Sequence, residues 1–400
     1  MAQTALMASA AENPPPSWRM DPKLTVHGAL DAAEARHPDV TLANALAGEA
    51  LAISQKSRAW LADAPMLSLH YQDDALASDV GLQELEAGLE LPLWRPRQRA
   101  GWHTLANEAD TIQSAYRQVL RWRLAGELRE HLWAVALADG ARAQARAATE
   151  SALELQRQIA ERINHGELPQ IDLNLSRRET LDRKIEQLET EAALANALES
   201  YRILTGLDAL PFAFKETEAA ERDLSDHPLL VLRRLQLSRA MVERDQAVAN
   251  RLGQPVLSVG ARREQGRAED EAINSVGLGV GIPIGLRAYA GPDIAAAEWD
   301  LADAKTKLAR EQRELGLAIS AAGNQVEIGR QALTLTTERA ELAAEHLSLS
   351  QAAFDLGEMD LMDFLLIRTA AYDTFRQQDR QRLTLARDIA RYNQLLGVMP

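Results

Sequence analysis

The sequence contains no cysteine, which excludes a disulfide framework and thiolate metal sites. Aromatic residues make up only 4% of its 400 residues, which disfavours aromatic-rich β-sandwiches. No run of about 18 apolar residues occurs, so a transmembrane helix is excluded, whereas transmembrane strands, whose hydropathy alternates, are not. Acidic residues outnumber basic residues by 58 to 44. The resulting net charge of −14 argues against a nucleic-acid partner, whose binding would need a basic face.

The abundant residues are those that favour helices, namely Ala, Leu, Glu, Arg and Gln. The first 22 residues differ from the rest because they are rich in proline. They contain neither a basic segment nor an apolar core, although Ala8, Ser9 and Ala10 resemble a cleavage site. We interpret residues 1–22 as either a flexible Pro-rich tail or the remnant of a signal peptide.

The remaining chain consists of two similar halves, residues 23–210 and residues 211–400. Three pairs of segments align at a constant offset of 191 residues: LPL 91–93 with IPI 282–284, HGELPQIDL 165–173 with LGEMDLMDF 356–364, and YRILTGL 201–207 with YNQLLGV 392–398. Nearer the start of each half the offset is 190, as in His37 and His227, each followed by proline. The constant offset predicts an internal duplication.

Each repeat is expected to contain a helix, a β-hairpin and a long helical hairpin. The expected β-hairpins span residues 64–94 and 254–285, and the helical tips lie near 166–172 and 357–363. Between residues 293 and 356 there is no proline, and apolar residues recur at heptad spacing in two runs: Leu301, Leu308 and Leu315, then Ile319, Val326, Leu333, Ala340 and Leu347. Such a helix would be roughly 90 Å long and would pack as a coiled coil.

The hairpin segments alternate with a period of two, as strands do. In the first repeat the alternation separates Leu85, Ala87, Leu89, Leu91 and Leu93 from Glu84, Glu86, Gly88, Glu90 and Pro92. In the second it separates Val276, Leu278, Val280, Ile282 and Ile284 from Ser275, Gly277, Gly279, Gly281 and Pro283. The alternate glycines do not form a dinucleotide fingerprint, because Ile282 occupies the position of the third glycine. The pattern fits either a soluble sheet with one wet face or strands long enough to cross a bilayer.

Together these features resemble TolC-type outer-membrane efflux channels, from about Leu24 to Val398. The resemblance is carried by the two tandem halves, the strand-final LPL and IPI, and the tips of the form G-E-x-x-x-x-D. It is strongest in the segments ELPLWRPRQR, GIPIGLRAYAGPDIAAAE and FDLGEMDLMDFL. The segments IPIG (282–285) and IAAAE (294–298) are most similar to those of the family branch that serves heavy-metal efflux pumps.

The resemblance implies a mainly α fold with a small β part: long coiled-coil helical hairpins in two tandem repeats plus four β-strands per chain. A homotrimer would supply 3 × 4 = 12 strands for one β-barrel in the cell outer membrane, and its helices would form a periplasmic tunnel. Such a protein is a passive export conduit without cofactor or catalysis. Its implied partners are outer-membrane lipid, a periplasmic adaptor (membrane fusion) protein and an inner-membrane pump of the resistance-nodulation-division type.

The resemblance also implies site residues. The family's D-x-x-D pair at the periplasmic entrance matches Asp363 and Leu366, so one carboxylate is kept, and Asp172 is the repeat equivalent of Asp363. A ring of three Asp363 carboxylates would concentrate cations. The tip turns are assigned to Gly166, Glu167, Gly357 and Glu358, and the barrel lumen to Glu84, Glu86, Glu90, Gly277, Gly279 and Gly281.

Other functional classes are less compatible with the sequence. No two of the eight histidines form an i, i+4 ligand pair, so no metal site is expected within one chain, and no catalytic triad can be argued from spacing. The alternatives are a soluble or periplasmic helical scaffold, including a degenerate channel homologue that does not insert, and an adaptor-like protein. Adaptors carry one helical hairpin, whereas this chain carries two.

Overall fold

The computed structural model describes residues 19–267, 269–285 and 287–400. The first repeat contains the elements β1 (Arg19–Asp21), α1 (Val26–Arg36), α2 (Asp39–Arg58), β2 (Met66–Asp73), β3 (Gln83–Pro92), α3 (Pro96–Asn164) and α4 (Gln170–Thr205). The second contains β4 (Ala209–Pro211), a 3-10 turn (Leu224–Asp226), α5 (Pro228–Asn250), β5 (Val256–Gln265), β6 (Ile273–Gly281), α6 (Arg287–Asp355) and α7 (Leu361–Leu395). The described chain is therefore mainly helical with a small β part, as the sequence predicts.

The internal duplication is visible in the backbone. The paired glycines Gly166 and Gly357, at the ends of α3 and α6, have φ values of 79° and 77°, and Gly206 and Gly397 have 72° and 75°. All four adopt the left-handed conformation that glycine reaches without steric cost, and each ends a helix. The two pairs are both 191 residues apart, so the offset read from the sequence holds in the structure.

Two short strands were not expected from the sequence. Strand β1 pairs in parallel with β4, with Met20 opposite Leu210, an offset of 190 residues. Each has only three residues, too few to show a period of two. Residues 1–18 of the expected N-terminal tail lie outside the described residues, whereas Arg19–Asp21 form β1. The described chain therefore enters the repeat fold earlier than residue 23, and the second repeat begins with β4 at Ala209 and not at residue 211.

The chain divides into two compact units that do not follow the repeats. Of the described residues, one unit contains 19–40, Leu120–Leu224 and Glu314–Pro400, and the other lies within Thr41–Val119 and Ser225–Arg313. Each unit takes elements from both repeats, because helices of one repeat pack on helices of the other. We call the first the helical unit and the second the sheet unit.

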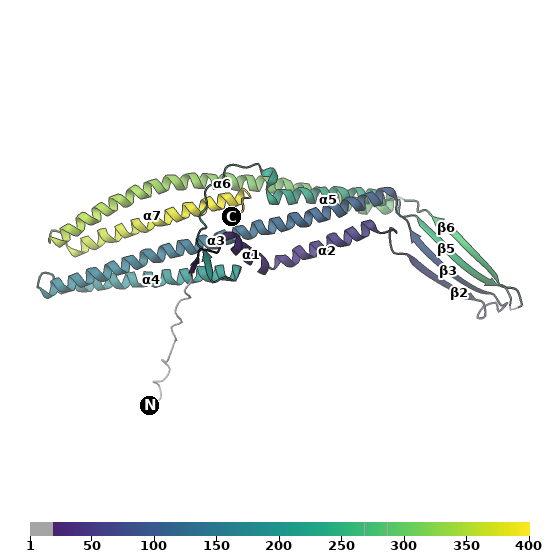
Figure 1. The fold of residues 1–400 in the computed structure, drawn as a ribbon, viewed down its shortest axis with the longest axis horizontal. Helices are drawn as coiled ribbons and strands as arrows, with labels where there is room; N and C mark the ends of the chain where they lie inside the picture. Colours follow the sequence, from purple (N-terminus) through teal and green to yellow (C-terminus); the bar gives the residue numbers. More distant parts are fainter. Residues whose placement is uncertain (1–18, 268, 286) are drawn as a thin grey trace, which may run out of the picture. The chain divides into compact units, whose positions relative to one another are not determined.

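The helical unit consists mainly of the antiparallel hairpins α3·α4 and α6·α7 (Figure 1). Helices α3 and α7 are joined by hydrogen bonds from Arg368 and Tyr372 to Ser151 Oγ, at 2.8 and 2.7 Å. Helices α6 and α7 are joined by Arg339 and Gln377. Helix α7 also contacts α4, because Arg183 donates to Thr369 Oγ1 at 3.2 Å and Arg376 pairs with Glu186.

A buried arginine holds the segment between the repeats against α3. Arg129 is 4% exposed and donates two hydrogen bonds to Glu216, at 2.6 and 2.9 Å, and one to the backbone oxygen of Val398, at 3.0 Å. Asn393 of α7 donates to the same carboxylate. Because a buried charge is stable only when paired, this network fixes both the linker and the C-terminal segment.

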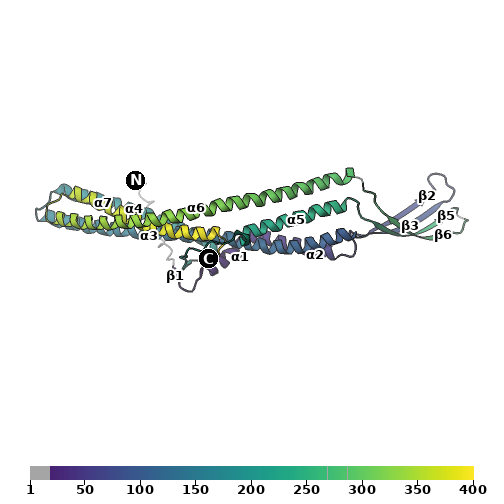
Figure 2. The same ribbon diagram turned by 90° about the horizontal axis from the view of Figure 1, so that it is seen from above.

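The sheet unit contains the antiparallel sheet β2-β3-β5-β6 (Figure 2). In the same unit, the start of α3 packs against α5. Gln98 donates to Asn250 Oδ1 at 2.9 Å, and Gln246 donates to the backbone oxygen of Gln98 at 2.8 Å. The two hairpins join through β3 and β5, which come from different repeats. The four strands predicted from alternation therefore form one sheet.

Candidate functional site

The strand register divides the sheet into two chemically different faces. On one face the cross-strand rows consist almost entirely of apolar residues: Leu67, Leu89, Val259 and Leu278 in one row, and Leu69, Ala87, Ala261 and Val276 in the next. Because successive side chains point to opposite sides, the intervening residues form the other face. The sheet thus has an apolar face and a polar face across its four strands.

The apolar face is not covered by any other part of the described chain. Val276 is 83% exposed and Leu278 is 76% exposed, and Leu67, Leu69, Tyr71, Leu85 and Leu89 of β2 and β3 are also exposed. A contiguous apolar surface of this kind marks a contact with a partner or a membrane. The single chain therefore exposes an apolar sheet face that a partner or a membrane would bury.

The polar face has a row almost without side chains. Ser68, Gly88, Gly260 and Gly277 lie opposite one another across the four strands. A Cβ atom added at Gly88 would lie 2.7 Å from Ser68 Oγ, and one at Gly279 would lie 2.5 Å from Ser258 Oγ. The glycines therefore leave room for the serine hydroxyls and keep this face thin.

Charged residues flank the glycine row on the polar face. Glu84, Glu86 and Glu90 of β3 lie there, as the alternation predicts, but they are accompanied by Arg262 of β5. Arg262 Nε lies 2.6 Å from Glu84 Oε1, and Arg262 Nη2 lies 3.0 Å from Glu264 Oε2. The acidic character of this face is therefore partly compensated.

Both outer strands of the sheet have an open edge. In the four-stranded order, β2 and β6 each have one hydrogen-bonded neighbour, β3 and β5 respectively. An open edge presents unpaired backbone donors and acceptors and can be extended by a further strand. The sheet can therefore be continued on both sides within a larger assembly.

The two helical tips of the helical unit have nearly identical backbones. In each, the nitrogen after the glycine is bonded five residues back: Glu167 to the backbone oxygen of Arg162 at 2.9 Å, and Glu358 to that of Ala353 at 2.9 Å. The predicted tip residues Gly166, Glu167, Gly357 and Glu358 thus occupy equivalent turns.

The tips are tied to one another by Arg162. Its Nη1 donates to the backbone oxygen of Phe354 at 3.3 Å, its Nε lies 3.2 Å from Glu167 Oε2, and its guanidinium lies over the Phe354 ring. Phe354 stacks on Phe364 with ring centroids 5.0 Å apart. An apolar cluster with a cation at its rim therefore holds the tips of the two repeats together.

The two predicted entrance carboxylates, Asp172 and Asp363, occupy equivalent positions in the two repeats. Asp172 and Asp363 both lie in the first turn of their helices, α4 and α7. Burial raises the pKa of Asp172, and the nearby charge of Asp360 raises it further. Asp360 is the N-cap of α7 and accepts from the Asp363 nitrogen at 2.8 Å. The neighbour of Asp172 is therefore Asp360, which sequence reasoning missed.

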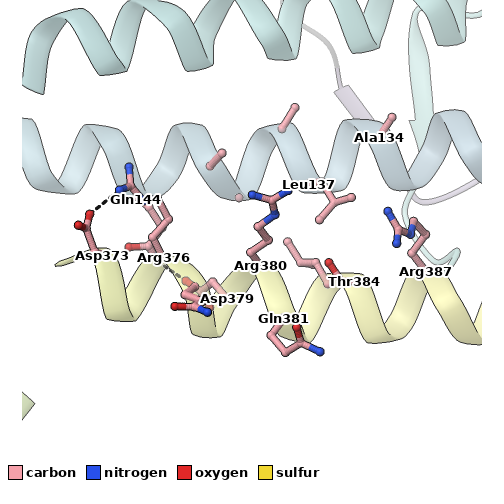
Figure 3. A pocket seen from close by; sticks show the side chains of 15 residues that line it. Ala134, Leu137, Gln144, Asp373, Arg376, Asp379, Arg380, Gln381, Thr384 and Arg387 are labelled. Carbon is pink, nitrogen blue, oxygen red and sulfur yellow. Dashed lines mark hydrogen bonds and ion pairs between the residues drawn. The ribbon is translucent and has the colours of Figure 1, made fainter. Parts of the chain in front are cut away.

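Helices α3 and α7 also enclose a groove of about 800 Å³ (Figure 3). Its α3 side is formed by small residues such as Ala134 and Gly140, while Arg380 extends across from α7 toward α3. A Cβ at Gly140 would lie 2.8 Å from Leu383 Cδ1, so glycine allows the close approach of the two helices.

Among residues 19–267, 269–285 and 287–400 there is no group of three or more His, Cys, Asp or Glu side chains that could hold a metal ion. No helix within the described ranges is long and apolar enough to cross a membrane.

No protein-family profile and no curated protein matches the sequence. Solved structures do match. The outer membrane channel CmeC of Campylobacter jejuni is 16% identical, with 93% of this chain and 85% of CmeC covered, at a TM-score of 0.72. The outer membrane protein VceC of Vibrio cholerae is 11% identical, with 93% and 96% covered, at 0.74.

A third match is the open state of the MtrE outer membrane channel of Neisseria gonorrhoeae, 13% identical, with 93% and 89% covered, at 0.66. Identities this low establish a common fold and nothing finer. The mainly helical fold with a small β part that the sequence resemblance implies for one chain is therefore confirmed.

Proposed function

We propose that this chain is the subunit of an outer-membrane channel that acts as a passive export conduit and not as an enzyme. The observation that carries the proposal is the uncovered apolar face of the sheet, in a fold shared with outer membrane channels. Strands of 8 to 10 residues are close to the length that crosses a bilayer when tilted. Contact with lipid would bury the exposed apolar face of the sheet.

The open edges of β2 and β6 favour a closed ring of sheets. A homotrimer would bring 12 strands together, with β6 of one copy beside β2 of the next. The polar face would then line the lumen, including Glu84, Glu86, Glu90, Gly277, Gly279 and Gly281. The long helices would form a periplasmic tunnel with the tips at its entrance.

The proposed cargo is cationic, with heavy-metal cations as the specific case. The polar face carries the carboxylates of Glu84, Glu86, Glu90 and Glu264 against the single guanidinium of Arg262. Acidic rings in a pore favour cations. The heavy-metal assignment is supported only by the similarity of the segment IPIG…IAAAE, and metal ions would be cargo without a resident site.

The proposed setting is the cell outer membrane of a tripartite efflux system. A periplasmic adaptor protein would dock on the helical part, and an inner-membrane pump of the resistance-nodulation-division type would supply the energy. We propose these partners because a passive channel has no energy source of its own. It can export a substrate against a concentration gradient only when it is coupled to a pump.

The test compares two neighbouring residues on opposite faces of β2. Leu69→Lys places a charge on the apolar face at mid-strand, where lipid contact would cost about 2–4 kcal/mol. His70→Lys places the same charge on the polar face, opposite Glu86. In planar bilayers and outer-membrane fractions, we expect the native chain and His70→Lys to insert and conduct, and Leu69→Lys to fail.

The main alternative is a soluble or periplasmic helical scaffold, including a channel homologue that does not insert. If the native chain remains soluble without detergent and never conducts, that alternative is correct. If Leu69→Lys inserts as well as His70→Lys, the apolar face does not contact lipid. Flux of Cd²⁺ against an organic anion through reconstituted vesicles separates metal export from a non-selective pore.

A further inference from the structure

The groove between α3 and α7 is rich in arginine. Its cavity of about 800 Å³ continues into a second cavity of about 350 Å³, because Ala134, Leu137 and Arg387 line both. We call the two cavities together the arginine groove. Its lining contains five arginines and three carboxylates: Arg129, Arg376, Arg380, Arg387 and Arg391, with Glu130, Asp373 and Asp379.

The two aspartates of the larger cavity are already paired. Asp373 accepts a hydrogen bond from Arg376. Asp379 accepts one from Gln144 and lies 3.4 Å from Nη2 of Arg382, which is outside the groove. Neither carboxylate is therefore left to neutralise a further cation in the groove.

Two of the arginines have no partner. Arg380 and Arg391 are exposed, and neither forms an ion pair or a hydrogen bond with any residue in the described part of the chain. Arg380 extends from α7 toward α3 (Figure 3). Arg387 binds the carboxylate of Asp388 at 2.9 Å, and the exposed Glu130 can oppose only one of the two free charges. The groove therefore retains an excess of positive charge that attracts anions.

The rest of the lining is largely apolar. Helix α3 contributes Ala134, Leu137, Ala138 and Ala141 to the larger cavity and Trp133 to the smaller one. Sites for small molecules are typically cavities of roughly 300–1,000 Å³ with an apolar lining and a few charged groups. The arginine groove therefore fits a drug-sized molecule that has an apolar body and an anionic group.

The groove and the linker between the repeats lie on opposite faces of the α3·α7 pair. The linker, residues 212–223, contacts Asn393 of α7, which accepts from the Ala219 nitrogen at 2.9 Å. Arg391, two residues before Asn393, lines the groove. Residues two apart in an α-helix point in directions roughly 200° apart, so the two contacts use opposite sides of α7.

The proposed tunnel gives these two faces different roles. A segment lying across the inner surface of a tunnel would obstruct it, so the face that carries the linker is the outer one. The arginine groove then lies on the inner face. The α3·α7 pair therefore presents Arg380 and Arg391 to whatever passes through the conduit.

We propose that the arginine groove binds an amphipathic organic anion inside the tunnel, with the anionic group at Arg380 and the apolar body against Ala134 and Leu137. A guanidinium forms strong, charge-assisted hydrogen bonds with sulfonate, phosphate or carboxylate oxygens. Arg391 provides a second cation in the smaller cavity. The inference rests on the proposed channel and adds organic anions to the cations proposed as cargo. Arg262 lowers the barrier to an anion in the sheet, because it compensates part of the acidic character there.

The test compares two fluorescent probes that share one apolar body. Anilinonaphthalene sulfonate carries a sulfonate group, and phenylnaphthylamine has the same rings without it. Each probe is titrated into the full-length chain in detergent, which covers the apolar sheet face, and into detergent alone. Fluorescence and calorimetry then give the affinity of each probe for the protein.

Three variants separate the charge of the groove from its space. Arg380→Gln with Arg391→Gln removes the two free guanidiniums. Arg177→Gln with Arg178→Gln is the matched control, because these exposed arginines of α4 line neither cavity. Ala134→Trp keeps every charge and fills the groove at an exposed residue that both cavities share.

We expect the native chain and the α4 control to bind the sulfonate equally, and the two groove variants to bind it roughly tenfold more weakly or worse. Affinity for the neutral probe should fall only in Ala134→Trp. Circular dichroism and assembly mass verify that all four proteins are folded. Equal sulfonate affinity in all four, or equal losses in the α4 control and the groove variants, would overturn the inference.

Conductance in planar bilayers distinguishes the failure of this inference from that of the proposed function. Block of the native channel by the sulfonate, weakened in Arg380→Gln with Arg391→Gln, would support a site inside the conduit. Sulfonate binding at the groove without any change in native conductance would place the groove outside the conduit and overturn the inference while the channel stands. A native chain that binds the sulfonate at the groove and never conducts would support the binding site and contradict the channel.

Discussion

Arg262 of β5 binds the carboxylate of Glu84 on β3, two positions along β3 from Glu86, the residue directly opposite it in the register. The diagonal pair places one positive charge among the acids of the polar face. The same arginine also reaches Glu264 on its own strand, so its removal would release two carboxylates at once.

The first prediction concerns ion selectivity. We expect Arg262→Gln to raise the cation-to-anion permeability ratio about twofold, because the polar face loses its guanidinium. Arg263→Gln is the matched control, since Arg263 is the next residue on the opposite face. Reversal potentials in a salt gradient measure both. An unchanged ratio in Arg262→Gln would show that permeating ions do not pass this face.

The second prediction concerns the helical tips. We expect Asp363→Ala to alter block by divalent cations at the tunnel entrance, because a ring of exposed carboxylates concentrates cations. Asp172→Asn should have a smaller effect on block, because Asp172 is more buried. Single-channel recordings with divalent cations added on the tip side compare the two, and equal block in both variants and the native chain would exclude a role for either residue.

The third prediction concerns acid stability. His227 is 2% exposed, accepts the N-cap bond from the Leu229 nitrogen, and has a pKa lowered to about 4 by burial, against a smaller opposing effect of Glu311. The unfolded chain therefore binds the proton more readily than the folded chain. Stability should be complete above pH 6.5 and should fall by up to roughly 3 kcal/mol as the pH drops toward 4.

The variant His227→Asn keeps a capping acceptor and removes the titration, so its denaturant unfolding should lose this part of the pH dependence. His37→Asn at the repeat-related position is the control, because His37 is partly exposed. Parallel pH profiles for the native chain and His227→Asn would contradict the assignment.

The fourth prediction concerns the Arg129 network. Arg129→Met should lower the free energy of unfolding of the helical unit by about 3 kcal/mol, because the half-buried carboxylate of Glu216 would lose its guanidinium partner. The double variant Arg129→Met with Glu216→Gln should recover part of the loss. Arg202→Met, which breaks the exposed pair with Glu199, should change little. Urea unfolding followed by circular dichroism ranks the three, and similar losses for Arg129→Met and Arg202→Met would refute the network.

The features that were predictable from the sequence are periodic. The offset of 191 and the alternation of β3 and β6 each repeat over many residues, so the repeats and both faces of the sheet could be described in advance. Arg262 also lies on an alternating strand, and the series Ser258, Gly260, Arg262 could have placed it on the polar face. Its pairing with Glu84 depended on the order β3-β5, which joins the two repeats and has no local signal.

The residues that were missed depend on single contacts. Asp360 approaches Asp172 only because the tips of the two repeats meet, and three-residue strands carry no pattern. The heptads of α6 indicated apolar faces but not which face α7 covers. Tertiary packing determines which face of α6 is covered. The exposure of Ile328, Leu335, Leu342 and Leu349 could therefore be established only from the structure.

The β1·β4 pair has a consequence for the timing of folding. Strand β1 is made first, yet its partner emerges only after about 190 further residues. At a synthesis rate of about 5–20 residues per second, that interval is roughly 10–40 s. Strand β1 must therefore stay unpaired while the whole first repeat is produced, and the β1·β4 pair can close only when the start of the second repeat has arrived.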